Sequence, residues 1–227
     1  MVTTQAIVLN VVKYQEKNLI VKCFTETDGI KTFFVRGAVK KSYFQPLNLL
    51  QISFQSRNKS ELFHFKTVEI LHPYQSLQLD YKKSVVVFFL SEFLYKILRE
   101  EYAQKELFHF IKNTLLFYDS VHWNPDFHIC FLMKITKYLG FYPDDSTVEN
   151  PYFNVKEGGF ESVFSYNCLP IEESDYIKKA MLTQWDKVTI FNGNERKKIV
   201  KTLLNYIQLH SHSKNEFQSL QIVDELM

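Results

Sequence analysis

The stretch DGIKTFFVRGAVKKSYFQPL, residues 28–47, has the pattern of a β-hairpin arm followed by a basic loop. It opens with Asp28-Gly29, a pair typical of tight turns between antiparallel strands. Residues 31–36 are rich in β-branched and aromatic side chains, which favours a strand. A loop with cations and no acid follows, and Gln45-Pro46 begins the next element. The stretch therefore predicts a hairpin that brings cations and aromatic rings to one edge of a small sheet.

Strand-like patterns also occur on both sides of this stretch. They give five expected strands, at residues 5–13, 18–25, 31–37, 50–55 and 61–70. In the last of them Phe63 and Phe65 share one face, and His64 and Lys66 share the other. Five short strands in about 70 residues, mostly without helices between them, are typical of a closed small barrel or a meander, and the five-stranded OB-fold is a common case.

The hydrophobic period becomes helical after residue 80. We expect helices at residues 81–102, 106–121, 125–140, 172–184 and 195–210, with a short helix or frayed end at 216–227. The sequence thus predicts an α+β protein with a five-stranded OB-fold barrel (1–72), a linker (73–80) and an all-α domain (81–227). Residues 141–170, which contain Pro143, Pro151 and the Gly158-Gly159 pair, are expected to form an irregular insert.

The composition limits the protein class. Charge is uneven, because residues 1–72 carry 10 Lys and Arg against 5 Asp and Glu, whereas residues 73–227 carry 17 against 20. A site for a polyanion is therefore expected on the N-terminal part. No apolar run approaches the ~20 residues of a membrane helix. The N-terminus lacks the pattern of a signal peptide, and the three isolated cysteines are expected to be reduced, which favours a cytoplasmic location.

Motifs for catalysis and for metal binding are not apparent in the sequence. It lacks the GxSxG, P-loop and HExxH patterns. The pairs Glu100-Glu101, Asp144-Asp145 and Glu172-Glu173 are sequence neighbours, and neighbours on a helix do not face each other. The histidines at 210 and 212 have no cysteines at zinc spacing. We expect a protein that is not an enzyme and has no cofactor or metal.

Cations with aromatic residues give the strongest functional signal. Arg36, Lys40 and Lys41 are expected on the basic loop, with Lys13, Lys22 and Lys31 in support, and this combination suits a polyanion with stackable bases. The alternative is a solvated loop with ordinary surface lysines. If Phe33 points inward, Phe34 points outward, where it would either stack a base or, as we favour, pack under the helical domain.

A second basic cluster lies in the first turns of an expected helix, after Asn192-Gly193-Asn194. It comprises Arg196, Lys197, Lys198 and Lys201. The helix dipole disfavours cations there, whereas free N–H groups and cations together suit an anion. The cluster is a candidate site for an acidic partner peptide or a second anion, so the alternative function is a peptide-binding module without direct DNA binding. Alternatively, Glu195 and distant acids offset the charge.

The chain resembles the RecO family of DNA repair proteins in motifs spread over most of its length. The matching residues are Ala6-Ile7-Val8-Leu9, Asn18-Leu19-Ile20-Val21, Phe24-Thr25 with Asp28-Gly29, Arg36-Gly37-Ala38, Gln45-Pro46-Leu47, Leu139-Gly140-Phe141 with Pro143, Phe153, and Glu157-Gly158-Gly159. The match is specific in the barrel and looser after about residue 170.

The resemblance implies a recombination mediator of the RecF pathway that acts in DNA recombination after DNA damage and has no catalytic centre. Such a protein binds single- and double-stranded DNA, anneals complementary strands and loads recombinase at gaps. The implied partners are RecR and the acidic C-terminal tail of the single-stranded DNA-binding protein. The implied location is the bacterial cytoplasm, in association with the nucleoid.

The chain departs from the family at the zinc site. Many members bind structural zinc through four cysteines in the segment equivalent to 141–170, where this chain has only Cys168. Zinc is therefore not expected here. We expect aromatic packing to hold the segment instead, through Phe141, Tyr142, Tyr152, Phe153, Phe160 and Phe164.

Overall fold

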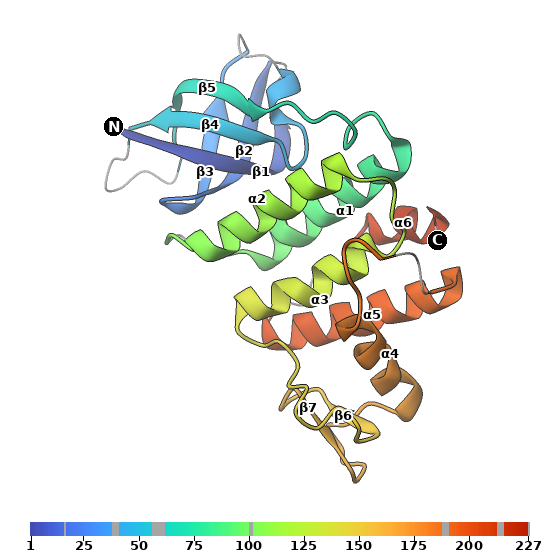
Figure 1. The fold of residues 1–227 in the computed structure, drawn as a ribbon. Coiled ribbons are helices and arrows are strands. Elements are labelled where there is room, and N and C mark those ends of the chain that lie inside the picture. The colour runs from blue at the N-terminus through green and yellow to red at the C-terminus, as the bar shows by residue number, and fades with distance from the viewer. Residues whose placement is uncertain are drawn as a thin grey trace. The chain divides into compact units, whose positions relative to one another are not determined.

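The computed structural model describes residues 1–15, 17–37, 41–55, 62–99, 102–187, 191–212 and 216–226. These residues form two compact units, Met1–Val121 and His122–Met227. Figure 1 gives the labels of the helices and strands in both units. Each unit is described by itself.

The first unit is built on an antiparallel five-stranded sheet with the OB-like pattern that the sequence predicted. The strand order is β3-β2-β1-β4-β5. The strands are β1 (Val2–Tyr14), β2 (Asn18–Thr25), β3 (Gly29–Val35), β4 (Leu49–Phe54) and β5 (Phe65–His72).

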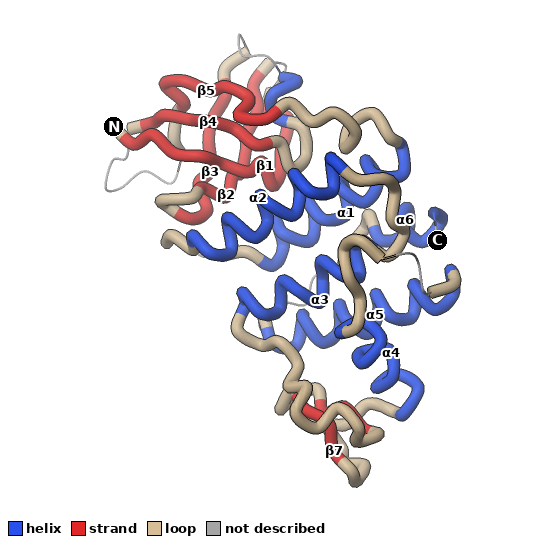
Figure 2. The backbone as a smooth tube through the Cα atoms, viewed as in Figure 1, coloured by secondary structure: helices blue, strands red, loops and turns tan. Residues whose placement is uncertain are grey.

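The sheet is curled (Figure 2), and β3 at one edge meets the segment before β5 at one point. A parallel bridge joins Phe33 in β3 to Phe63, just before β5. The Phe34 N–H donates to the Phe63 carbonyl at 2.8 Å, and the Phe63 N–H donates to the Thr32 carbonyl at 2.9 Å. No ladder continues this bridge in the described part of the chain, so the barrel is only partly closed.

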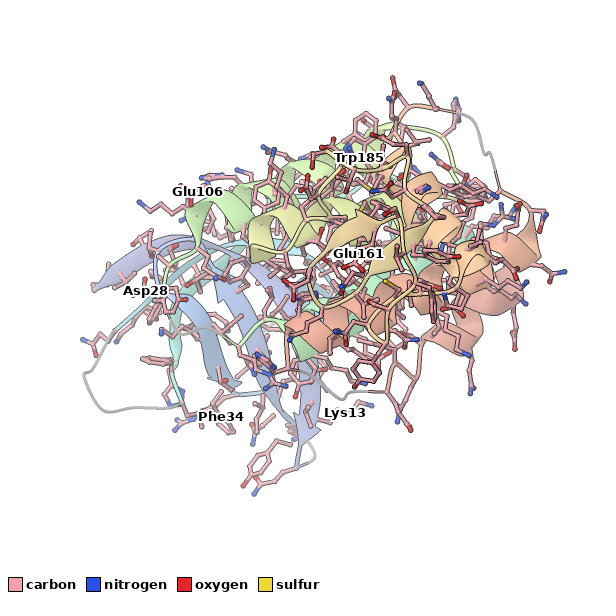
Figure 3. The ribbon with its side chains drawn as sticks, turned by 90° about the horizontal axis from the view of Figure 1, so that it is seen from below. Lys13, Asp28, Phe34, Glu106, Glu161 and Trp185 are labelled. Carbon is pink, nitrogen blue, oxygen red and sulfur yellow. The ribbon has the colours of Figure 1, made fainter. Side chains whose placement is uncertain are left out.

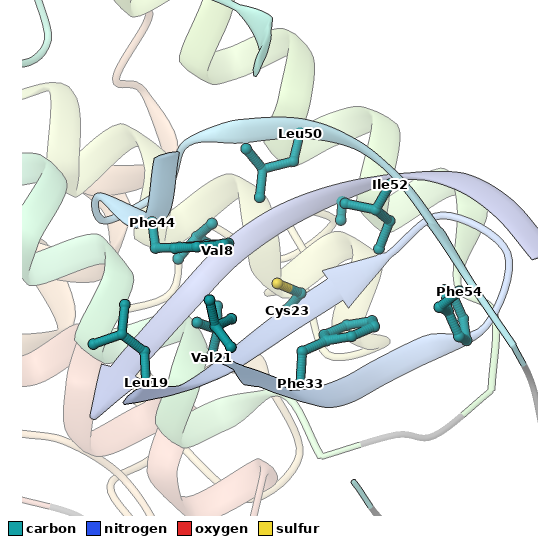
Figure 4. Close-up of a cluster of buried hydrophobic side chains, with 11 residues drawn as sticks. Val8, Leu19, Val21, Cys23, Phe33, Phe44, Leu50, Ile52 and Phe54 are labelled. Atoms are coloured by element: carbon teal, nitrogen blue, oxygen red, sulfur yellow. The ribbon is translucent and has the colours of Figure 1, made fainter. Parts of the chain in front are cut away.

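The core of the barrel is filled by inward side chains of β1 to β4 (Figure 4), and partly buried side chains of β5 pack against them. Phe33 is fully buried and stacks on Phe65, with ring centroids 4.1 Å apart. Burying a Phe side chain in this way stabilises the fold by about 2–3 kcal/mol. Phe44, at the end of the short 3₁₀ helix η1 (Lys41–Phe44), packs on Phe65 from another side.

Helices α1 (Tyr81–Ile97) and α2 (Lys105–Ser120) pack on the outer face of β1 and β2 (Figure 1). Ser91 in α1 donates a hydrogen bond to the Leu9 carbonyl at 2.7 Å. Phe108 in α2 contacts Phe24 in β2, with centroids 5.6 Å apart. Helix α1 is shorter than expected, because Leu98 takes an extended conformation and ends it.

The segment at 73–80 is tied to the end of α2 by one carboxylate. Asp119 accepts backbone N–H bonds from Gln75, Ser76 and Leu77 at 2.7–3.1 Å. Burial tends to raise the pKa of this carboxyl, but the N–H donors outweigh burial and hold the pKa below its usual value. The segment and both helices therefore belong to the compact unit of the sheet. The expected domain division at 72 and 81 stays a prediction.

A buried cation supports the same junction. Lys83 in α1 donates to the Tyr118 carbonyl and to the Ser76 hydroxyl, each at 2.8 Å. These bonds satisfy one of the carbonyls at the end of α2 that lack a partner within the helix. The ammonium group of Lys83 thus forms hydrogen bonds that stabilise the first unit.

The second unit contains four helices in its described residues. They are α3 (Phe127–Leu139), α4 (Ile171–Met181), α5 (Gly193–His210) and α6 (Leu220–Leu226). Helix α3 ends at Gly140, which adopts a left-handed conformation with φ of 88°, as predicted. Most other residues are strained in that conformation.

The expected irregular insert contains a short hairpin, which is a correction to the sequence analysis. Its strands are β6 (Tyr152–Asn154) and β7 (Gly159–Glu161). Three residues per strand are too few to give a visible alternation. Phe153 and Phe160 are buried, and Phe153 also packs on Tyr206 of α5.

The other aromatic residues of the insert do not all pack as expected. Tyr142 and Phe164 are 39% and 55% exposed, so they contribute less to the packing of the segment. Phe141 contacts Tyr206 and His210, and Tyr152 contacts Phe164. The apolar centre of this region is therefore smaller than the sequence suggested.

Candidate nucleic-acid interface

The tip of the β1–β2 hairpin carries two exposed lysines. Tyr14 and Asn18 form the last pair of the ladder, and Lys13 and Lys17 lie beside them in solvent. Gln15 takes a positive φ of 54°, which turns the chain tightly. The turn leaves Tyr14 on the outer face of the sheet, 46% exposed.

The end of β3 lies beside this tip. Side chains alternate along β3, so Phe33 and Val35 are buried, whereas Phe34 is half-buried on the outer face and Arg36 is exposed. The predicted inward and outward faces are therefore confirmed. Gly37 sits so close to the hairpin that a Cβ there would lie 2.9 Å from the Lys17 Cβ.

Phe34 packs against rings from two other segments. Its centroid lies 5.9 Å from that of Tyr14 and 5.7 Å from that of His64, and both contacts are edge-on. His64 is placed there by the parallel bridge at Phe63. The expectation that Phe34 would pack under the helical domain is wrong, because its ring contacts are with the hairpin and with the segment before β5.

A hollow of about 340 Å³ opens at this point. We call it the aromatic hollow and define it by its lining residues. These are Phe34, Val35, Arg36, His64 and Phe65. Figure 3 shows Phe34 and Lys13 toward the same end of the sheet, with Asp28 toward the other.

Three cations surround the hairpin end and are called the basic rim: Lys13, Lys17 and Arg36. In the strand register, Lys13 pairs with Leu19 and Leu19 pairs with Val35, so the Cα atoms of Lys13 and Arg36 lie about two strand spacings apart, roughly 10 Å. None of the three forms an ion pair within the described part of the chain. The rim thus presents open positive charge next to aromatic rings.

The structure brings together only some of the six cations that the sequence singled out for DNA. Lys41 is exposed on η1, whose Phe44 contacts the hollow residue Phe65. Lys22 is half-buried, with its Nζ 5.0 Å from the centre of the Tyr95 ring in α1. Lys31 lies five residues before Arg36, about 17 Å away along β3. Lys40 lies outside the described residues.

Sequence reasoning missed Tyr14, Lys17 and His64 as members of the site. Tyr14 and Lys17 lie at a hairpin turn whose polar sequence gave no indication of a binding site. His64 reaches Phe34 only through the bridge between β3 and the segment before β5, a contact between residues about 30 positions apart. No local sequence signal reveals such a contact.

Two of the four cations of the second basic cluster are paired with acids of their own unit. Arg196 is buried, with Nη1 3.4 Å from the Asp126 carboxylate, and it also donates to the Phe191 carbonyl. Lys198 lies 2.8 Å from Glu172. This contact and a bond from Tyr176 hold the pKa of Glu172 below its usual value. Lys197 and Lys201 remain exposed.

The start of α5 is capped by the protein itself. Asn192 and Glu195 form a capping box, in which each side chain accepts the backbone N–H of the other residue at 3.0 Å. Lys179 lies 3.3 Å from Glu195. Asn192, Glu195 and Lys179 at this helix start therefore already have partners.

The donors near Cys168 do not fit structural zinc. The Cys168 thiol lies 3.3 Å from Glu161 and 3.2 Å from Ser165, and Asn154 donates to the other Glu161 oxygen at 2.6 Å. A structural zinc site takes four Cys or His ligands. The described residues contain no cluster of three or more His, Cys, Asp and Glu suited to a metal. Hydrogen bonds and the Phe153–Phe160 contact connect this segment instead.

The acid pairs do not assemble a catalytic centre in the part of the chain that is described. Asp144 accepts bonds from Ser146 in a loop, and Glu172 pairs with Lys198 at the start of α4. Glu100 and Glu101 lie outside the described residues. The absence of enzymatic activity stays a prediction.

No described helix is both long and apolar enough to cross a membrane.

Two family models cover most of the chain. "Recombination protein O N terminal" matches residues 1–74, and "Recombination protein O C terminal" matches residues 78–216. The chain belongs to the RecO family. The sequence resemblance is therefore confirmed, and the basic rim lies on the part that matches the N-terminal RecO model.

Curated RecO relatives match the chain from end to end. "DNA repair protein RecO" of Flavobacterium psychrophilum is 38% identical over 234 residues, covering 99% of this chain and 98% of the relative. The protein of the same name from Flavobacterium johnsoniae is 37% identical, with the same coverage. The one from Christiangramia forsetii is 32% identical and covers 100% of this chain and 99% of the relative. This chain is thus a RecO-family DNA repair protein.

Proposed function

We propose that this RecO-family protein binds single- and double-stranded DNA through its basic rim, anneals complementary strands and helps to load recombinase at gaps together with RecR. The observation that carries the proposal is the open positive charge of Lys13, Lys17 and Arg36 beside exposed aromatic rings. In OB-folds, the face of the second and third strands and the neighbouring loops bind oligonucleotides. Lys17 lies in the turn between β1 and β2, Phe34 lies in β3, and His64 lies in the segment between β4 and β5.

The proposed mechanism is electrostatic. Each cation that neutralises a phosphate releases condensed counterions, which favours binding at low salt. Two strands whose phosphates are partly neutralised repel each other less, so they pair more readily. Base pairing between the strands then supplies the specificity, and the protein needs no code for base edges.

The partners and the location follow from family membership and belong to the same proposal. We expect contacts with RecR and with the acidic C-terminal tail of the single-stranded DNA-binding protein, in the bacterial cytoplasm and near the nucleoid. Lys197 and Lys201 are the exposed cations of α5 that remain for an acidic tail. A peptide-binding module without DNA binding is less favoured, because Arg196 and Lys198 already face acids.

The test removes the charge of the basic rim. The variant Lys13→Ala/Lys17→Ala/Arg36→Ala is titrated with a labelled single-stranded oligonucleotide at several salt concentrations. We expect weaker binding and a log–log salt slope reduced by up to about 2, since each lost phosphate contact on a single strand removes about 0.7. The annealing rate of complementary strands should fall with the affinity.

The control removes three exposed lysines of the second unit, Lys137, Lys156 and Lys187. Its net charge equals that of the rim variant, so a general charge effect would appear in both. Circular dichroism checks that each variant is folded. An unchanged affinity and slope in the rim variant would reject the basic rim as the DNA site.

A further inference from the structure

The aromatic hollow is not explained by the binding of phosphates. A cation alone suffices to neutralise a phosphate, and an exposed apolar surface next to it adds nothing to that interaction. Here Arg36 lines the same hollow as the rings of Phe34 and His64. A ligand that suits both groups carries a negative charge and a flat aromatic ring.

We propose that the aromatic hollow holds one unpaired nucleobase of single-stranded DNA, stacked on Phe34 or His64, with Arg36 at the adjoining phosphate. The proposal rests on the proposed DNA binding and goes further by assigning a subsite for a base. The aromatic hollow has a volume of about 340 Å³, which lies within the roughly 300–1,000 Å³ typical of pockets for small ligands. The subsite would favour single strands, because the bases of a duplex are already stacked and paired.

The arrangement of the rings leaves Phe34 suited to this role. Tyr14 and His64 meet Phe34 at interplanar angles of 75° and 79°, so neither lies flat on it. Phe65 differs, because it stacks on Phe33 at 11° and on Phe44 at 16°. Phe65 thus serves the core, whereas parallel stacking by Phe34 is not used within the described residues.

The surroundings also hold Phe34 in place before a ligand arrives. Its backbone N–H is fixed to the Phe63 carbonyl at 2.8 Å, and the rings of Tyr14 and His64 lie on two sides of it. A ring that is already positioned loses little conformational freedom on binding, which favours affinity. The same contacts offer a competing explanation, in which the three rings only brace the hairpin tip.

The experiment separates these two explanations with the variant Phe34→Leu, which keeps an apolar side chain and removes the ring. The probes are a fifteen-residue oligo(dT) and a duplex of equal length. We expect roughly tenfold weaker binding of the single strand, since one base–aromatic stack has this effect. Duplex affinity and the salt slope should stay as in the wild type.

The matched control is Phe88→Leu, the same substitution at a Phe that is 51% exposed on α1 and does not line the hollow. It should leave single-strand affinity unchanged. Phe34→Tyr and Phe34→Trp keep a ring and should restore most of the binding. Rescue by these rings shows stacking, because leucine and the aromatic side chains all fill the site with apolar atoms.

A further probe removes the bases and keeps the phosphates. An abasic oligonucleotide of the same length should bind the wild type and Phe34→Leu equally. An oligonucleotide with one 2-aminopurine should lose fluorescence on binding to the wild type and lose less on binding to Phe34→Leu, since stacking quenches this base.

The inference is overturned if Phe34→Leu binds single strands as the wild type does, or if it weakens single strands and duplexes equally. It is also overturned if the difference persists with the abasic probe. These outcomes leave the proposed DNA binding intact as long as the rim variant still loses affinity. If the rim variant has no effect on binding, the proposed function fails first.

Discussion

The cations at the hairpin end of the barrel and those at the start of α5 differ in their surroundings. Lys13, Lys17 and Arg36 face solvent and form no ion pair within the described residues. Arg196 is buried against Asp126, and Lys198 meets Glu172. The charge of the first cluster is therefore exposed to solvent, whereas two of the four cations of the second pair with acids of the fold.

The difference shows that a run of basic residues is a weak sign of a binding site until its acids are located. The acids that pair with α5 come from α4 and from the turn before α3, far away in sequence. Lys83 is a second example, in the first unit, because its ammonium group donates to the Tyr118 carbonyl at the end of α2. The predictions below test this distinction, beginning with the largest effect.

The first prediction concerns the buried cation of α5. Arg196→Met should lower the free energy of unfolding by about 3 kcal/mol, because it leaves the Asp126 carboxylate buried without this partner. Urea denaturation measures the change. Lys197→Met, on an exposed neighbour, should stay within about 0.5 kcal/mol of the wild type. Equal stability of the two variants would show that the buried Arg196 contributes no more to folding than the exposed Lys197.

The second prediction concerns Asp119, which shares the Ser76 hydroxyl with Lys83. Asp119→Asn should cost about 2 kcal/mol at neutral pH, because charged acceptors make stronger hydrogen bonds than amides. The pKa of Asp119 is depressed in the folded state, so its contribution is complete above the unfolded pKa of about 3.9 and is lost as pH falls through the folded pKa.

Stability measured at pH 7 and at pH 3 checks this linkage. Wild-type stability should fall more between the two pH values than that of Asp119→Asn, since the variant has no carboxyl to protonate at this position. Parallel curves for the two proteins would contradict the depressed pKa. DNA affinity at neutral pH should be the same in both, because Asp119 belongs to the junction of the helices and not to the basic rim.

The third prediction concerns Gly37, the residue after Arg36, which lies close to Lys17 at the hairpin tip. Gly37→Ala should cost about 1 kcal/mol, because the new Cβ would lie 2.9 Å from the Lys17 Cβ and 3.2 Å from the Lys17 carbonyl oxygen. The forced shift separates two cations of the rim, so DNA affinity should fall a few-fold. Gly159→Ala is the control, since nothing lies within 4 Å of its added Cβ. If Gly37→Ala and Gly159→Ala change stability and DNA affinity equally, the contact between Gly37 and Lys17 does not position the cations of the basic rim.

The last prediction has the smallest effect. Lys198→Ala removes an ion pair whose two side chains are 58% and 67% exposed, so the unfolding midpoint should not change measurably. DNA affinity should also stay close to that of the wild type. A loss of affinity as large as that of the rim variant Lys13→Ala/Lys17→Ala/Arg36→Ala would place DNA on α5 and would contradict the difference between the two clusters.

Much of the fold was predictable because its signals are local. The period-2 pattern around Phe33, the Asp28-Gly29 turn and the left-handed Gly140 each depend on a few neighbouring residues. The β6–β7 hairpin was missed because strands of three residues carry almost no pattern. The identity of the family was also within reach, since it rests on motifs that can be compared without a structure.

Local sequence was enough to specify the strands, most of the helices and the outward direction of Phe34. Long-range contacts specified the rest. The Phe33–Phe63 bridge set His64 against Phe34, the packing of Gly37 on Lys17 gathered the rim, and Asp126 took up the charge of Arg196. The physical reason is that periodicity and turn chemistry act over a few residues, whereas an ion pair or a hollow requires segments that only folding brings together.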